Sequence, residues 1–431
     1  MSFFYVLKKY LNDSIFLWVF SIVMAVSCVA INHIEKNKLN DNHTVYSYIA
    51  TSEYGFNRLI SVNDSKNVVP VMKTDSSPDK LYATYALLMD GDNGRVLFQK
   101  NGNEKVPMAS TTKIMTLIVT LENADLNDIV TVSSYAASMP EVKLNIKKDE
   151  QYRLKDLVYS LMLESHNDSA VAIAEYIGGS IEGFAQMMNK KAEELGAYDT
   201  HFVTPNGLDD DDHYTTAKDL ALITKYALEN PEFIKIIQTK NYTFHEQTKG
   251  RCFTLNNKNR FLDIYEGAIG VKTGFTGKAG YCFVGAANRE DETYISVVLA
   301  CGWPPNKNYK WNDTQKLMDY GFSNYEKVNI IEPGISFQSI RVENGIDIEK
   351  ITPYVKDSVT LSLCENDVVT YDIEVPDYIS APVKKDQNVG TLTITINDDV
   401  YKVIPLYSRE SCKEITYQYI LKKIFLQFLV F

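Results

Sequence analysis

The sequence is poor in the residues that build disulfide frameworks, metal centres and nucleic-acid interfaces. Six cysteines and six histidines occur in 431 residues. The cysteines are too few and too scattered for a disulfide framework in a chain of this size. No two histidines are spaced as His-x-x-x-His and no glycine-rich phosphate-binding loop occurs, so we expect no metal and no cofactor. The net charge of −11 and the lack of a basic cluster argue against a nucleic-acid partner.

What the chain does have is the apolar and aromatic content of a folded protein. Hydrophobic residues make up 45% of it and aromatic residues 12%. A chain of 431 residues exceeds one ordinary hydrophobic core, so the length predicts two domains with additional terminal segments. Cys282 and Cys301 lie in apolar, strand-like runs and are expected to be buried thiols.

A Ser-x-x-Lys pattern occurs at Ser110 and again at Ser77, and its context separates the two. Ser77 is followed by Pro78 in a polar, turn-like stretch. Ser110 follows Pro107 and precedes apolar residues at helical spacing, namely Ile114, Met115, Leu117, Ile118 and Leu121. We therefore expect a helix to start at Ser110.

The spacing of Ser110 and Lys113 suits nucleophilic catalysis. Residues three apart share a helix face, and the amino-terminal dipole favours developing negative charge. A lysine accepts a proton only when its amine is neutral, so its pKa must fall from about 10.4, which burial and a second cation such as Lys272 would cause. The alternative is that Ser110 caps a helix and Lys113 is a solvated surface lysine.

A second motif, Ser165-His166-Asn167, interrupts two apolar helical stretches at 154–163 and 170–174. A hydroxyl and an amide held rigidly between packed helices suit proton relay and binding of a substrate amide. The alternative is a helix end followed by an Asn or Asp cap.

The third motif, Lys272-Thr273-Gly274, continues the apolar run 268–271 and precedes further apolar runs at 281–287 and 294–301. These runs predict neighbouring strands, with glycine where a backbone approaches a ligand. A lysine and a threonine hydroxyl on a strand suit binding of a carboxylate. An edge strand carrying an ordinary solvated lysine is the alternative.

The order of the three motifs resembles that of the low-molecular-mass penicillin-binding proteins, the serine-type D-alanyl-D-alanine carboxypeptidases. Other stretches extend the resemblance from about Leu81 to about Leu406: 85–90 with 94–97, 108–109, 204–208, 213–220, 381–385 and 390–392. The resemblance implies an α/β fold class, in the form of an α+β sandwich of the β-lactamase and transpeptidase type. In that fold an antiparallel sheet is flanked by helices, a helical subdomain is added, and a second, smaller all-β domain follows.

The resemblance also implies a substrate, an inhibitor class and a set of residue roles. The substrate is a peptidoglycan stem peptide ending in D-Ala-D-Ala, β-lactams are the inhibitors, and the process served is cell-wall biogenesis and cell shape. The implied catalytic roles are Ser110 as acyl-ester nucleophile, Lys113 as its base and Ser165 as proton relay. The implied binding roles are Asn167 as partner of the substrate amide and the lysine, Lys272 with Thr273 as carboxylate anchor, and Gly274 with Phe275 at the substrate site. The resemblance further implies that the backbone amides of Ser110 and Phe275 form the oxyanion hole.

One residue departs from the family pattern, and three other functions stay open. His166 stands where family members often carry Gly or Asp, which leaves fine specificity open and allows the interpretation of His166 as a second base. A β-lactamase shares all three motifs, although no Glu-x-x-Leu-Asn follows the second one. A DD-endopeptidase with the same site and a catalytically silent penicillin-binding wall module would carry the same motifs.

The amino-terminal segment predicts export. After Lys8 and Lys9, residues 15–31 are apolar apart from Ser21 and Ser27, as in a signal peptide or a single membrane anchor. Cleavage after Ala25-Val26-Ser27 and lipid modification of Cys28 are further options. Each places the enzyme on the extracytoplasmic face of the bacterial membrane.

Changes in composition along the chain predict five segments. We expect a signal or anchor at 1–31, a polar linker at 32–80, the catalytic domain at 81–325, a β domain at 326–408 and a terminal helix at 409–431. The terminal segment carries apolar residues with Lys422 and Lys423 among them, which is typical of a helix lying in a membrane interface. The alternative is a terminal helix packed on the β domain.

Overall fold

The computed structural model describes residues 43–48, 78 and 80–428, which form two compact units. The first, called here the mixed unit, comprises residues 78, 80–330 and 359–367 among those described. The second, the β unit, comprises residues 331–358 and 368–428 together with strand β1. The expected signal or anchor at 1–31 and the Ser77 motif lie outside the described residues.

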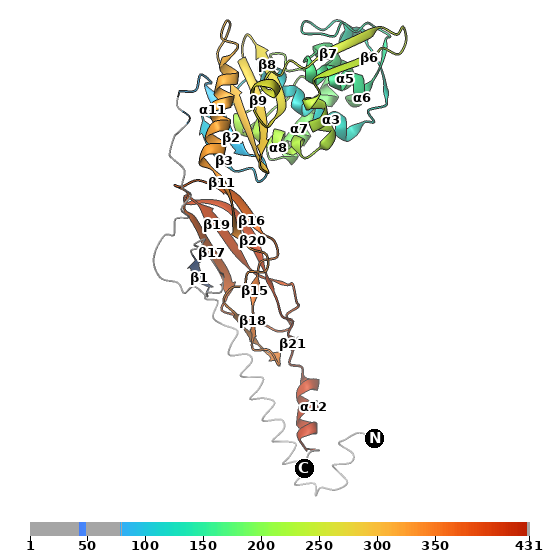
Figure 1. Cartoon of the computed structure of the whole chain (residues 1–431). Coiled ribbons are helices and arrows are strands. Elements are labelled where there is room, and N and C mark those ends of the chain that lie inside the picture. The colour runs from blue at the N-terminus through green and yellow to red at the C-terminus, as the bar shows by residue number, and fades with distance from the viewer. Residues whose placement is uncertain (1–42, 49–77, 79, 429–431) are drawn as a thin grey trace, which may run out of the picture. The chain divides into compact units, whose positions relative to one another are not determined.

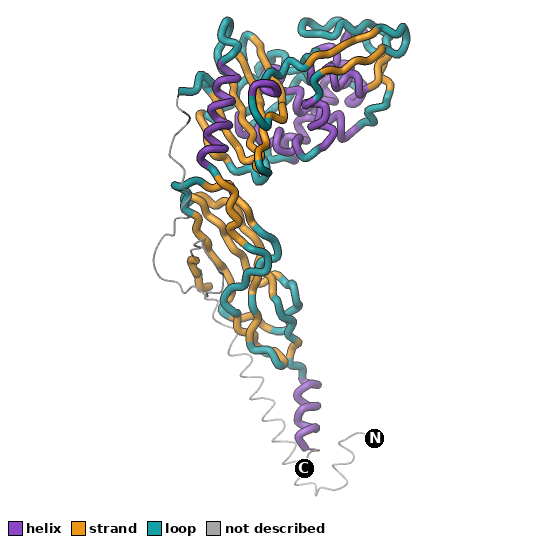
Figure 2. The backbone as a smooth tube through the Cα atoms, viewed as in Figure 1, coloured by secondary structure: helices purple, strands orange, loops and turns teal. Residues whose placement is uncertain are grey.

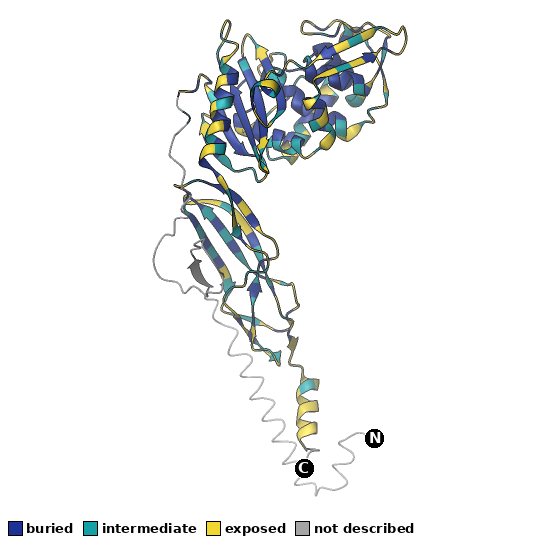
Figure 3. Ribbon diagram, viewed as in Figure 1, coloured by how far each residue is buried: buried dark blue, intermediate teal, exposed yellow. Residues whose placement is uncertain are grey.

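An antiparallel sheet with the strand order β3-β2-β10-β9-β8 organises the mixed unit (Figure 1). Its strands are β2 (Tyr85–Asp90), β3 (Val96–Lys100), β8 (Ala268–Thr276), β9 (Gly280–Arg289) and β10 (Glu292–Leu299). Strand side chains alternate between faces. Leu87 and Met89 therefore enter one hydrophobic cluster, while Ala86 and Leu88 enter a second one with helix α11 (Tyr309–Asn324). Figure 3 shows these strands as largely buried.

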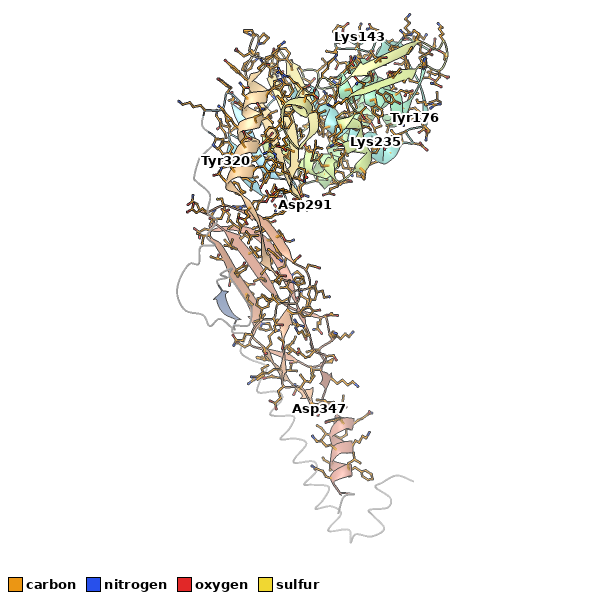
Figure 4. The ribbon with its side chains drawn as sticks, viewed as in Figure 1. Lys143, Tyr176, Lys235, Asp291, Tyr320 and Asp347 are labelled. Carbon is orange, nitrogen blue, oxygen red and sulfur yellow. The ribbon has the colours of Figure 1, made fainter. Side chains whose placement is uncertain are left out.

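The first of these clusters joins the sheet to a group of helices (Figure 2). They are η1 (Ala109–Thr112), α3 (Lys113–Asn123), α4 (Ser134–Ala137), α5 (Leu154–Leu163), α6 (Asn167–Gly178), α7 (Ile181–Glu194), α8 (Ala217–Leu228) and α9 (Pro231–Gln238). The short helix α10 (Phe261–Ile264) contributes Phe261 to the second cluster. Side-chain caps fix several starts, as where Thr216 accepts from the Asp219 N–H and Asn230 from the Glu232 N–H before Pro231. In Figure 4, Tyr176 and Lys235 mark α6 and α9, and Tyr320 marks α11.

Two small hairpin-like pairs complete the helical part of the mixed unit. Strand β4 (Ile129–Thr131) pairs with β5 (Gln151–Arg153), and β6 (Asn241–His245) pairs with β7 (Cys252–Asn256). With its sheet flanked by helices, this unit confirms the predicted α/β fold class.

The β unit consists of strands followed by one helix. Its main sheet has the order β1-β17-β19-β20-β15. The strands are β1 (His43–Tyr48), β12 (Ile340–Glu343), β13 (Gly345–Ile346), β14 (Lys350–Ile351), β15 (Pro353–Tyr354), β17 (Val369–Pro376), β18 (Tyr378–Ser380), β19 (Asn388–Ile396), β20 (Asp399–Ser408) and β21 (Lys413–Glu414). The predicted second, all-β domain is thereby confirmed. Strand β1 lies within the segment expected to be linker, where it pairs antiparallel with β17.

A short segment from the later part of the chain belongs to the mixed unit. Strand β16 (Val359–Leu363) pairs with β11 (Glu326–Ile331), and the Ser362 hydroxyl donates to Asp90. Arg95 and Asp367 form a buried ion pair at 2.5 Å. Residues 359–367 therefore pack with the mixed unit although they fall inside the range expected for the β domain.

The last helix, α12 (Tyr417–Phe428), carries apolar side chains on its surface (Figure 3). Those exposed by 40% or more are Tyr417, Ile420, Leu421, Ile424, Phe425 and Leu426. Within residues 43–48 and 80–428, no helix has both the length and the apolar character that crossing a bilayer requires.

Candidate active site

The nucleophile turn, residues 109–113, brings the first motif together. Ser110 lies on η1 and Lys113 opens α3, so one turn separates them. Lys113 Nζ lies 2.9 Å from Ser110 Oγ. Ala109, directly before the serine, adopts a left-handed conformation with φ of +48°, which is strained for a residue with a side chain. Surrounding contacts must therefore hold this turn in place.

The Lys113 amine is buried and lies near three oxygen atoms. Its side chain is completely inaccessible to solvent. Besides Ser110 Oγ, Nζ contacts Asn167 Oδ1 at 2.9 Å and the Asn206 carbonyl oxygen at 2.7 Å. Burial and the positive charge of Lys272 hold the pKa of Lys113 well below its usual value, and the negative charge of Asp168 opposes them. The interpretation of Lys113 as a solvated surface lysine is wrong.

The second motif lies between α5 and α6. Ser165 has a φ of +67°, and its buried Oγ has no hydrogen-bond partner among the described residues. Asn167 begins α6, and its backbone N–H donates to the Val142 carbonyl at 2.7 Å. Asp168 follows, and its carboxylate accepts from the Leu144 N–H at 2.9 Å. These bonds hold the loop at 140–146 against the motif.

The third motif lies on β8, the edge strand that runs beside the nucleophile turn. A Cβ atom on Gly274 would lie 3.1 Å from the backbone nitrogen of Ser110, so glycine permits this close approach. Lys272 is 2% exposed, and burial lowers its pKa to about 7. Its Nζ donates to the Thr273 carbonyl at 3.0 Å. Like Lys113, Lys272 is not the surface lysine of the alternative interpretation.

The other two predicted residues of interest are Phe275, which is exposed, and His166, which is buried beside α5. Phe275 is 43% exposed and its ring lies 4.6 Å from that of Tyr281. His166 is buried, and its Nδ1 lies 2.8 Å from Ser160 Oγ. Its Nε2 lies 3.5 Å from a Glu164 oxygen. Because Ser160 and Glu164 engage both ring nitrogens, this geometry does not favour His166 as a second base for Ser110.

One residue near the lysine amine was missed by the motif analysis. Asn206 contributes its backbone carbonyl, not its side chain, to Lys113. The only signal for it in the sequence is the family-like stretch at 204–208, which carries no acid, base or nucleophile.

The remaining polar clusters take no part in this arrangement. Cys282 and Cys301 are buried as predicted, and burial raises the pKa of Cys282 to about 12. Four consecutive aspartates at 209–212 form surface contacts with the turn after β8, as where Lys278 pairs with Asp211 at 2.6 Å. Among the residues described, no group of three or more His, Cys, Asp and Glu side chains is placed to hold a metal.

Two family models match the chain, one for each part. The model described as D-alanyl-D-alanine carboxypeptidase matches residues 72–302. The model for the C-terminal domain of penicillin-binding protein 5 matches residues 325–414. Between them they span both the three motifs and the β-rich region.

Named relatives and solved structures agree with these models. D-alanyl-D-alanine carboxypeptidase DacF of Bacillus subtilis is 34% identical over 79% of this chain and 88% of its own length. DacC of Escherichia coli is 33% identical over 76% and 84%. The crystal structure of penicillin-binding protein 5 from Haemophilus influenzae matches with a TM-score of 0.67 and 28% identity, covering 79% of this chain and all of that one. Matches of this extent show that the chain belongs to the D-alanyl-D-alanine carboxypeptidase family of serine peptidases.

Proposed function

We propose that this enzyme removes the terminal D-alanine from peptidoglycan stem peptides through an acyl-enzyme on Ser110, and that β-lactams acylate the same atom. One observation carries the proposal. The buried Lys113 amine touches Ser110 Oγ, Asn167 Oδ1 and the Asn206 carbonyl oxygen within 2.9 Å.

The proton count at Lys113 assigns a direction to each contact. A neutral amine has two N–H bonds and one lone pair. The Asn206 carbonyl oxygen only accepts hydrogen bonds, and so does the Oδ1 atom of Asn167, so they take both N–H bonds. The lone pair of Nζ then faces the Ser110 hydroxyl, which donates to it. Burial and the charge of Lys272 lower the pKa of Lys113, which favours this neutral form, and in the proposal it acts as general base.

The reaction follows from this arrangement. Lys113 takes the Ser110 proton while Oγ attacks the carbonyl carbon of the penultimate D-alanine. The bond to the terminal D-alanine breaks, and its amine leaves with a proton delivered through Ser165, whose buried hydroxyl is free of other partners among the described residues. Water then attacks the ester, which releases the shortened peptide and restores Ser110.

Lys272 and Thr273 anchor the terminal carboxylate of the substrate in this proposal. The pKa of Lys272 lies at about 7 without a ligand, and a nearby carboxylate raises it, so binding favours the charged amine. The close approach of Gly274 to the Ser110 backbone supports an oxyanion hole made by the amides of Ser110 and Phe275.

The test is mass spectrometry of the penicillin-treated protein combined with an assay of D-alanine release. We expect one penicillin on the peptide that contains Ser110. Ser110→Ala should lose this label and at least about 10⁴-fold of the D-alanine release. Ser180→Ala removes a helix cap on α7 and serves as the control that keeps both. Undiminished release by Ser110→Ala would contradict the proposal.

We also propose that the protein is exported and that α12 attaches it to the membrane surface. The exposed apolar side chains of this helix support attachment, and Lys422 and Lys423 suit anionic headgroups. The full chain should float with anionic vesicles, and the double variant Leu421→Glu, Leu426→Glu should not. Val400→Glu, which alters an exposed apolar residue of the β unit, is the matched control. Flotation of the double variant would refute attachment by α12.

A further inference from the structure

His213 is a buried imidazole that the reaction sequence above does not use. It is 3% exposed and packs edge-on against the Phe202 ring, with 5.9 Å between ring centroids. Its Nδ1 accepts hydrogen bonds from the backbone N–H groups of Val203 at 2.9 Å and Thr204 at 3.4 Å. Its Nε2 lies 2.8 Å from Thr112 Oγ1.

These contacts fix the tautomer of the ring and the direction of the next two hydrogen bonds. Because Nδ1 accepts, the ring proton must lie on Nε2, which donates to Thr112 Oγ1. The Thr112 hydroxyl then donates to the Ala109 carbonyl at 2.8 Å. Burial lowers the pKa of His213 to about 4, so the neutral ring that this chain of bonds requires persists at neutral pH.

The Ala109 carbonyl is the peptide oxygen directly before the nucleophile. Two neighbours hold it. Thr112 donates a hydrogen bond to it, and the backbone of Gly207 packs so close that a Cβ atom there would come within 2.0 Å of the oxygen. Gly207 has a φ of +83°, so only glycine accommodates this position without strain. Together these contacts hold Ala109 in its strained left-handed conformation.

The segment 203–213 thus contacts both groups between which the proton moves. These are the Lys113 amine and, through Thr112, the nucleophile turn that carries Ser110. At one end it supplies the Asn206 carbonyl to Lys113. At the other it presents His213 to the nucleophile turn through Thr112. A single segment therefore sets the position of Ser110 and of the acceptor that orients its base.

We propose that His213 is a positioning residue for the acylation step, acting through the Thr112 hydroxyl on the Ala109 carbonyl to hold Ser110 in register with Lys113. The proposal rests on the function assigned above to Ser110 and Lys113. The imidazole touches neither substrate nor reacting atoms. Its contribution is geometric, and a displacement of about 1 Å at a reacting group costs on the order of 10²-fold in rate.

The first test removes the hydroxyl and then restores it. Thr112→Val keeps the shape but breaks the chain of bonds, and we expect acylation by a penicillin to slow by about 10- to 100-fold. The Michaelis constant for a D-Ala-D-Ala peptide should hold, because the carboxylate anchor is untouched. Thr112→Ser should recover most of the rate. His213→Gln should resemble Thr112→Val, whereas His201→Gln, which lies just before this segment and whose ring Nδ1 contacts the Asp212 carbonyl at 2.6 Å, should not.

The second test does not depend on activity. Nitrogen-15 NMR of the histidine rings should show His213 neutral, with its proton on Nε2. A proton on Nδ1, or wild-type acylation by Thr112→Val, would overturn the proposal. If Ser110→Ala still acylated, the assigned function would fail instead, so the two failures are distinguishable. A rate loss that merely tracks the loss of folded protein in denaturation curves would also overturn the positioning role.

Discussion

The mixed unit and the β unit differ in whether they bury charged side chains. Among the described residues, every buried Lys, Asp and Glu side chain lies in the mixed unit, including Lys113, Lys272 and Asp168. The β unit buries apolar side chains and the Ser408 hydroxyl. Removing an ion from water costs several kcal/mol. The mixed unit bears that cost at several buried side chains, among them the two lysines of the proposed active site, whereas the β unit shows no comparable site among its described residues.

The largest expected effect tests whether a buried lysine of the mixed unit acts in catalysis while an exposed lysine of the β unit does not. Lys113→Met removes the general base, so we expect acylation by a penicillin to fall on the order of 10²- to 10⁴-fold. Lys402→Met alters an exposed lysine of the β unit and should change nothing. Stopped-flow acylation measures both variants. Equal acylation rates for the two variants would show that the buried lysine has no more role in acylation than the exposed one.

The next effect concerns stability and compares one ion pair from each unit. Arg95 and Asp367 are 11% and 3% exposed, so Asp367→Asn leaves a buried cation without its main partner. We expect the free energy of unfolding of the mixed unit to fall by about 3–5 kcal/mol.

The matched control is the exposed pair of Arg341 and Glu343 in the β unit. There Glu343→Gln should cost about 1 kcal/mol or less, because water screens the pair. Urea titrations of both variants provide the measurement. Similar losses for the two would show that burial does not distinguish the units.

A smaller effect follows from the pKa of Lys272, which is about 7. The amine loses its charge as pH rises through this value, and with it the attraction for the substrate carboxylate. The Michaelis constant for a D-Ala-D-Ala peptide should therefore rise above pH 7, by up to about tenfold per pH unit. The same peptide with a terminal amide should show no such rise. Parallel profiles for the two peptides would argue against Lys272 as the anchor.

The smallest effect concerns the coupling between the two buried lysines. Because the charge of Lys272 lowers the pKa of Lys113, Lys272→Met should raise that pKa. Lys113 would then become protonated at a higher pH, and the acid limb of the acylation profile should move upward. Acylation rates measured from pH 4 to 9 test this shift. A shift downward would show that the two amines are not coupled in this way.

The three motifs predicted the side chains of the proposed active site, but not the surrounding residues that hold these side chains in place. Ser110, Lys113 and Asn167 are recognisable because each carries its chemistry in a side chain at a fixed spacing. Asn206 was missed because a backbone carbonyl is common to all residue types. The role of His213 was also missed, since its partner Thr112 is distant in sequence and only folding brings the two together.

The domain organisation shows the same division. The change to short Ile-, Val- and Thr-rich runs after about residue 328 predicted a β domain, because alternating patterns report on strands. No local pattern indicated that residues 359–367 join the mixed unit or that β1 adds to β17. Both depend on which strand edge is open, and edges are a property of the assembled sheet.

By itself, the sequence determined the three motifs and their spacing, because these are local properties, and through the family resemblance that the motifs carry it indicated the fold class, the family and the residues proposed for acyl transfer. Only the tertiary structure decided that the lysines are buried, that their pKa values fall, and that the Lys113 amine lies beside Ser110 Oγ. Those outcomes depend on desolvation and on hydrogen-bond partners drawn from distant segments, and both arise when the chain packs.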